Sequence, residues 1–145
     1  MLAKSLFLFG CLPFFVLGAL HTIYTIADIR VPKKLVPHDP EVAAMMKSSA
    51  LALTKETDMW RAWVGFNISH GVGLLFYASA YAYLAIFHFQ VLSGSTVLLI
   101  GAPLIALIYL TLSKKYWFRI PVLGSLVGLL CLSFGVVATV LANAP

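Results

Sequence analysis

The chain has 145 residues, of which 61% are apolar and only 10% are charged. Soluble domains are about half apolar and about one-quarter charged, so this composition excludes an ordinary soluble domain and indicates a membrane protein. The formal net charge is +5, and we attribute it to the placement of basic residues in loops rather than to nucleic-acid binding.

Four segments are long and apolar enough to cross a bilayer, which takes about 20 mainly apolar residues in a helix. They cover residues 5–27, 62–87, 95–112 and 121–141. Transmembrane strands are shorter and alternate in polarity, whereas helices satisfy their own backbone hydrogen bonds where water is absent. We therefore predict an all-α fold, a four-transmembrane-helix bundle in which residues 1–145 form a single integral membrane domain.

Between the first and second spans lies one sizeable polar stretch, residues 28–61. Asp39 before Pro40 and Glu41 is a favourable helix start, with a capping side chain, a proline in the first turn and an acid near the positive end of the dipole. From there to about residue 57, apolar residues gather on one face: Val42, Met45, Met46, Ala50 and Leu53. The pattern predicts a short amphipathic helix on the cytoplasmic membrane surface; the alternative is a helix packed on the protein's own loops.

Basic residues are concentrated in two of the three loops. The first loop holds Arg30, Lys33, Lys34, Lys47, Lys55 and Arg61, and the third holds Lys114, Lys115 and Arg119. By the positive-inside rule, these two loops are cytoplasmic and both chain termini lie outside. All five acidic residues also fall in or beside the first loop, so this loop is mixed in charge and is no polybasic patch for nucleic acid.

The fourth span contains Gly124 and Gly128 at the four-residue spacing that lets two helix backbones approach closely, and Gly135 extends the same side. Two interpretations stay open for this stripe. It packs inside the bundle, or it forms the face of a homodimer. The expected partners are the lipid bilayer and either a second membrane protein or a second copy through Gly124 and Gly128.

The second span has an unusual polar and aromatic stripe. At about 100° per residue, one face carries Trp63, Asn67, His70, Leu74, Tyr77, Tyr81 and His88. Small residues, Gly65, Ser69 and Gly73, form a second stripe beside it. Because lipid favours neither face, we predict that this span lies inside the bundle, with positions 67 and 70 turned toward the first span.

The first span offers a matching stripe near its cytoplasmic end, and its His21 lies at a similar depth to His70 of the second span. Intramembrane histidine and asparagine are costly to bury without a partner and by default mark function. We predict a polar pocket open toward the cytoplasm. Its candidate residues are His21, Tyr24, Asp28, Arg61, Trp63, Asn67, His70 and Tyr77. The alternative is that His70 and Asn67 only hydrogen-bond across helices to hold the bundle together.

Two histidines at matched depth also suggest axial ligation of a haem, although no CxxCH attachment motif is present. No acidic residue lies deep in a span and no Glu-x-x-His pair occurs, so a zinc or di-iron site is not predicted. We expect no resident cofactor and no metal, with haem as the alternative. The chain contains no recognisable catalytic set, because Ser69 points about 100° away from His70 around the helix.

The segment WRAWVGFNISHG, residues 60–71, together with the upstream DPEVAAMMKSSALALTKET, resembles an uncharacterised family of small bacterial four-helix membrane proteins. The resemblance covers the whole chain in architecture and is specific over residues 38–75. It implies a single membrane domain in the bacterial inner membrane and brings no activity, cofactor or substrate. The matching positions are Trp60, Arg61, Trp63, Gly65, Phe66, Asn67, Ser69 and His70.

Two functional hypotheses follow from these patterns. The first is an accessory or interaction subunit without catalytic activity, or a binder of a lipid or other hydrophobic small molecule through the polar pocket. The second is a membrane redox or isomerase-type enzyme that uses His21 and His70 as haem or metal ligands or as acid–base groups.

Overall fold

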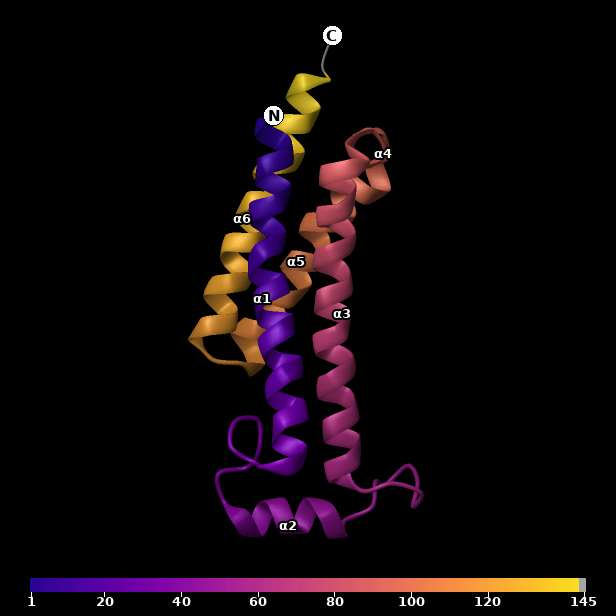
Figure 1. Cartoon of the computed structure of the whole chain (residues 1–145), viewed down its shortest axis with the longest axis vertical. Helices are drawn as coiled ribbons and strands as arrows, with labels where there is room; N and C mark the ends of the chain where they lie inside the picture. The colour runs from indigo at the N-terminus through magenta and orange to yellow at the C-terminus, as the bar shows by residue number, and fades with distance from the viewer. Residues whose placement is uncertain (144–145) are drawn as a thin grey trace. The chain divides into compact units, whose positions relative to one another are not determined.

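The computed structural model describes residues 1–143 and places most of them in helices (Figure 1). The helices are α1 (Leu2–Arg30), α2 (Pro40–Ser48), α3 (Met59–Phe87), α4 (Phe89–Gly94), α5 (Thr96–Tyr116) and α6 (Arg119–Ala142). Four of them, α1, α3, α5 and α6, are long and apolar enough to cross a membrane. The predicted all-α fold with four such helices is confirmed. Four helices of this length and composition are typical of an integral membrane protein.

Each long helix corresponds to one predicted span; α1 and α6 exceed the predicted limits at both ends, α3 only at its start and α5 only at its end. Helix α1 continues to Arg30, and α5 includes Lys114 and Lys115 in its last turn. A span that is predicted from its apolar residues alone ends at the first charged residue. A real helix continues into the headgroup region, where long basic side chains reach water while the backbone stays helical.

Helix α2 starts as predicted, with the Asp39 side chain accepting a hydrogen bond from the Glu41 amide and Pro40 in the first turn. Its predicted end near residue 57 is wrong, because the helix stops at Ser48. The amide of Met59 donates to the carbonyl of Ser49, and Ala50 pairs with Asp58 in an isolated bridge. Residues 49–58 therefore form a loop whose two ends are held together by backbone hydrogen bonds.

The segment predicted as the second loop contains the short helix α4. His88, which the sequence pattern assigned to the stripe of the second span, lies outside α3, because α3 ends at Phe87 and His88 caps α4. Its Nε2 atom is 3.0 Å from the Tyr83 hydroxyl oxygen. His88 is therefore an exposed residue at a helix junction and no part of the buried stripe.

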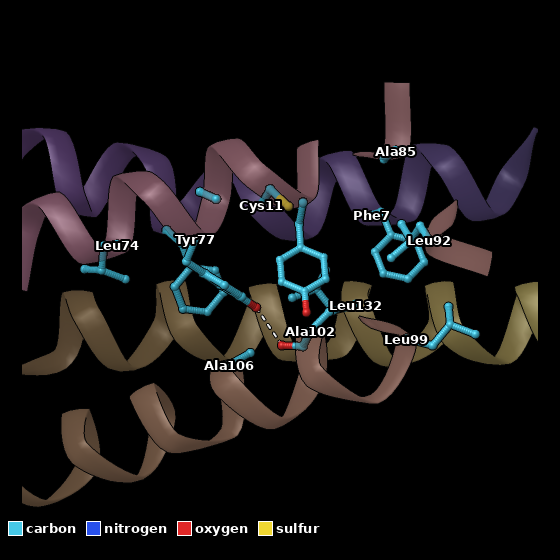
Figure 2. Close-up of a cluster of buried hydrophobic side chains, with 13 residues drawn as sticks. Phe7, Cys11, Leu74, Tyr77, Ala85, Leu92, Leu99, Ala102, Ala106 and Leu132 are labelled. Atoms are coloured by element: carbon cyan, nitrogen blue, oxygen red, sulfur yellow. Dashed lines mark hydrogen bonds between the residues drawn. The ribbon is translucent and has the colours of Figure 1, made fainter. Parts of the chain in front are cut away.

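The chain forms two compact units. Unit 1 comprises Met1–Leu17 and the described residues from Leu74 onward, and unit 2 comprises Gly18–Gly73. The apolar core in Figure 2 belongs to unit 1, where Phe7, Cys11 and Phe14 of α1 are buried among residues of α3, α4, α5 and α6. Within this core the Tyr77 hydroxyl donates to the Ala102 carbonyl of α5 over 2.6 Å.

The glycine stripe of α6 packs against α1 within unit 1. A Cβ atom at Gly128 would lie 2.4 Å from a ring carbon of Phe14 and 3.0 Å from the carbonyl oxygen of Gly10. Gly124 faces Leu17, and Gly135 faces Phe7. The structure thus uses this stripe for packing inside the chain, which was one of its two interpretations. A homodimer through the same stripe stays a prediction, and it would have to displace α1.

The second small-residue stripe, on α3, is exposed, and its predicted position inside the bundle is wrong. A Cβ atom at Gly65 or Gly73 would meet nothing within 4 Å, and Ser69 is exposed. The Ser69 hydroxyl donates to the Phe66 carbonyl of its own helix. Small side chains permit close helix contact but do not require it, so the stripe alone did not determine which face of α3 is buried.

Candidate functional site

Unit 2 brings together an asparagine and two histidines from two membrane-crossing helices. The Nε2 atom of His21 on α1 lies 2.9 Å from the Oδ1 atom of Asn67 on α3. Asn67 is only 1% exposed, whereas His21 is half-buried. The predicted orientation of position 67 toward the first span is thus observed.

His70 completes this group, which we call the imidazole cluster (His21, Asn67 and His70). Its ring centroid lies 5.1 Å from that of His21, with the two rings at 67° in an edge-to-face arrangement. On its other side, the His70 ring stacks on Phe66 at 6.2 Å, and Phe66 is 63% exposed. The cluster therefore lies next to an exposed aromatic side chain and is only partly shielded by protein.

Helical geometry fixes the position of Asn67. Its Nδ2 atom donates to the carbonyl of Trp63, one turn earlier on α3, over 2.7 Å. This bond settles which end of the amide faces His21, because the nitrogen is committed to Trp63 and the oxygen is left for the imidazole. Asn67 is therefore a rigid acceptor that selects a His21 ring with a proton on Nε2.

The two helices can carry this contact because they approach closely at Gly71. A Cβ atom at Gly71 would lie within 3.1 Å of the Gly18 carbonyl oxygen and closer still to the hydroxyl of Thr22. The Thr22 hydroxyl donates to that same Gly18 carbonyl over 2.9 Å. Neither Thr22 nor Gly71 was predicted as a site residue. The sequence signal for them was Gly71 itself, which lies one helical turn after Asn67.

Asp28 lies at the C-terminal end of α1 and is 3% exposed. Its two carboxylate oxygens accept hydrogen bonds from the backbone amides of Lys33, Lys34 and Leu35. These residues belong to the segment 31–38 that follows α1, which we call the strap. Asp28, a predicted pocket residue, therefore folds the strap back onto the end of its own helix.

Trp63 holds the strap from the side of α3. Its indole Nε1 atom donates to the carbonyl of Leu35 over 2.9 Å. Because the carbonyl of Trp63 accepts from Asn67, a continuous series of contacts runs from the strap through Trp63 and Asn67 to His21. The predicted pocket residues Asp28, Trp63, Asn67 and His21 thus form one connected polar framework.

Three predicted site residues lie apart from this framework. The side chain of Tyr24 is exposed, and its ring lies 5.7 Å from the ammonium nitrogen of Lys34. Arg61 is exposed, and its backbone amide donates to the Asp58 carboxylate at the start of α3. Tyr77 belongs to unit 1, where its hydroxyl is committed to Ala102. Their inclusion in one predicted pocket does not give them a common environment.

The arrangement of the two histidines bears on the haem hypothesis. Axial ligands approach the iron from opposite faces of the porphyrin, which requires the two rings to be separated by the macrocycle. The rings of His21 and His70 instead touch edge to face. The described arrangement therefore does not fit a haem held between them. In residues 1–143, no group of three His, Cys, Asp or Glu side chains gathers in a geometry that could hold a metal ion.

Unit 2 also contains a cavity that was not predicted. It has a volume of about 680 Å³ and lies among the strap, α2 and the start of α3. Its basic residues had been interpreted from the sequence mainly as a topology signal.

Comparison of the chain with family models, with curated proteins and with solved structures finds no match in any of the three. The resemblance over residues 38–75 therefore stays a prediction. Function must therefore be inferred from the geometry of unit 2.

Proposed function

We propose that this chain is an accessory or interaction subunit without catalytic activity, which binds a lipid or other hydrophobic small molecule at the imidazole cluster. The observation that carries the proposal is the hydrogen bond between the buried Asn67 and the half-buried His21, with the half-buried His70 ring against His21, on membrane-crossing helices. Imidazoles offer hydrogen bonds to a carbonyl or hydroxyl of a ligand. The exposed Phe66 ring beside them supplies apolar contact.

The proposed location follows from the charge distribution and the resemblance. We place the chain in the bacterial inner membrane, with both termini outside and the first and third loops in the cytoplasm. In that orientation α2 and the strap lie at the cytoplasmic surface. The exposed apolar residues Val42 and Met45 of α2 would then rest in the headgroup region, as expected for an interfacial helix.

The binding proposal predicts that His70→Ala lowers the amount of ligand that copurifies with the chain. A hydrogen bond in a weakly polar site is worth roughly 1–3 kcal/mol, so we expect a loss of about tenfold in ligand retained, measured by native mass spectrometry and lipid extraction. Asn67→Ala should have a similar effect, because the His21 ring loses the acceptor that orients it.

His88→Ala is the matched control, because it removes an exposed histidine at the α3–α4 junction of unit 1. Thermal unfolding should change little in all three variants, since a hydrogen bond between membrane helices contributes about 0.6 kcal/mol on average. If His70→Ala and Asn67→Ala retain every lipid, ligand and partner that the unaltered chain retains, the cluster has no binding role.

A second candidate is an isomerase-type enzyme that uses His21 and His70 as acid–base groups. It is favoured by one observation, the contact of a second imidazole with a His21 ring that Asn67 orients. Histidine is the side chain best suited to proton transfer near neutral pH.

The redox version of this candidate requires a haem between His21 and His70. The contact between the two rings leaves no space for one there. We therefore expect the purified chain to show no Soret band in its absorption spectrum. A Soret band that disappears in His70→Ala would contradict this expectation and would make the redox version the leading hypothesis.

A further inference from the structure

The cavity of unit 2 is a half-open hollow bounded by the strap, α2 and the start of α3. The strap and α2 supply most of its wall, and one tryptophan of α3 supplies the rest. The lining residues are Pro32, Lys33, Lys34, Val36, Pro37, His38, Pro40, Ala43, Ala44, Lys47 and Trp60. Its volume of about 680 Å³ lies within the range of small-molecule sites in proteins.

The charge of the cavity wall has one sign. Among the described residues that line it, Lys33, Lys34 and Lys47 carry positive charge and none is acidic. Lys47 extends from α2 over the Trp60 ring, with 5.5 Å between its ammonium nitrogen and the ring centroid. Three lysines in the wall of one concave space attract an anion, and lysine is a common phosphate ligand.

The strap that carries two of these lysines is held in place before any ligand arrives. The carboxylate of Asp28 binds the backbone amides of Lys33 and Lys34 themselves, and Trp63 binds the carbonyl of Leu35. On the strap these bonds engage backbone atoms only, so they leave the side chains of Lys33 and Lys34 uninvolved. The Lys34 ammonium nitrogen lies 5.7 Å from the centroid of the exposed Tyr24 ring and would leave that ring to reach a bound phosphate. A site ordered in advance loses less conformational entropy on binding.

Apart from His38, the remaining wall is apolar. Pro32, Val36, Pro37 and the Trp60 ring provide surface for the uncharged part of a ligand. Helix α2 runs across the ends of α1 and α3 within this unit (Figure 1). The cavity is thus located where lipid headgroups are expected.

We propose that this cavity binds a phosphate group, carried either by an anionic lipid headgroup or by a small soluble phosphate ester. Lys33, Lys34 and Lys47 neutralise the phosphate, and the proline and tryptophan surfaces contact the glycerol or other organic part next to it. This site is separate from the imidazole cluster and goes beyond the proposed function. The two can fail independently, because the variants that test them share no residue.

The test uses the full chain in nanodiscs of phosphatidylcholine, with and without phosphatidic acid, and in detergent with glycerol 3-phosphate. Native mass spectrometry counts bound phosphatidic acid, and ligand-induced shifts of the unfolding temperature report glycerol 3-phosphate. Retention of phosphatidic acid alone identifies a lipid headgroup as the source of the phosphate. A shift with glycerol 3-phosphate identifies a soluble ester. Failure of both probes to bind overturns the proposal.

The decisive variant replaces all three lysines, as K33Q/K34Q/K47Q. Each basic residue near an anionic lipid surface strengthens binding about fivefold, so we expect affinity to fall roughly a hundredfold when all three are removed. The matched control K55Q/K114Q/K115Q removes the same charge from lysines that do not line the cavity and should bind as the unaltered chain does. Equal losses in the two variants would indicate attraction by net charge and would refute a defined site.

A charge-neutral variant tests the cavity independently, in case the triple lysine variant does not fold. Ala44→Phe places a ring into the cavity from α2 while leaving every lysine in place. Because Ala44 is exposed, this change should leave thermal unfolding unaltered and still reduce binding at least as much as K33Q/K34Q/K47Q. Undiminished binding in Ala44→Phe would mean that the cavity is not the site.

Discussion

Replacing Asp28 with alanine is expected to release the strap from the end of α1. One carboxylate holds the amides of Lys33, Lys34 and Leu35, and hydrogen bonds to a charged group contribute about 1.5–3 kcal/mol each. Loss of only two of these bonds, at the lower value, already corresponds to at least roughly a hundredfold increase in local opening. Hydrogen exchange measured by mass spectrometry should therefore accelerate by that order in residues 31–38 and remain unchanged in α5.

Two variants serve as comparisons for Asp28→Ala. Asp28→Asn keeps one acceptor oxygen and should give an intermediate exchange rate. Glu56→Gln removes the same charge from an exposed position of the first loop and should leave the strap protected. If the strap exchanges equally slowly in Asp28→Ala and in the unaltered chain, the hydrogen bonds to Asp28 do not hold it.

The Asp28→Ala variant also tests whether the strap supports phosphate binding in the cavity. Lys33 and Lys34 reach the cavity from a backbone that Asp28 holds. Asp28→Ala should therefore weaken phosphatidic acid binding although Asp28 does not line the cavity. Binding at the imidazole cluster should be less affected, because Asn67 and His21 are held by their own helices.

The helical content of this chain was predictable because solvent dictates it. A long apolar segment in hydrocarbon must satisfy its own backbone, and only a helix does so within one segment. The end of α2 was not predictable on this ground. Residues 49–58 are polar enough for water to satisfy their backbone, so the pairing of Ser49 with Met59 competes with continued helix. Serine and threonine nearby add local alternatives: the Ser48 hydroxyl donates to the Met45 carbonyl, and the Thr54 hydroxyl accepts from the Glu56 amide.

The contact between His21 and Asn67 was predictable because burial of an amide in a membrane helix requires a polar partner at the same depth. Few residues at that depth offer one. The environments of Tyr24 and Tyr77 were not predictable in this way, because tyrosine tolerates many environments. Its ring is apolar, and its hydroxyl needs one bond only, which Tyr77 finds at the Ala102 carbonyl.

The cavity was not predictable from residue spacing, because it depends on how an irregular strap folds back onto a helix end. The signal was present in Asp28, an acid at the boundary of a span that is followed, at residues 32–37, by a segment rich in proline and lysine. Such an acid can cap the helix that follows, form an ion pair or bind backbone amides. Only the path of the strap selects the last of these.

The substitution Gly128→Ala on α6 is expected to destabilise the chain strongly for its size. A Cβ atom at this position would lie 2.4 Å from Phe14 and 3.0 Å from the Gly10 carbonyl oxygen. The Phe14 ring is fully buried and packs against Tyr77, with 5.3 Å between ring centroids, so it has little space to retreat. Overpacking of this kind costs about 1–3 kcal/mol.

The same substitution at Gly65 and Gly73 provides the control, since a Cβ atom there would meet nothing within 4 Å. Alanine is favoured over glycine in a helix by about 1 kcal/mol, so Gly65→Ala and Gly73→Ala should leave stability unchanged or raise it. Unfolding in detergent, followed by circular dichroism, should therefore shift in opposite directions for Gly128→Ala and the two α3 variants. Equal shifts would mean that α6 does not pack on α1 through Gly128, and would reopen that stripe as a homodimer face.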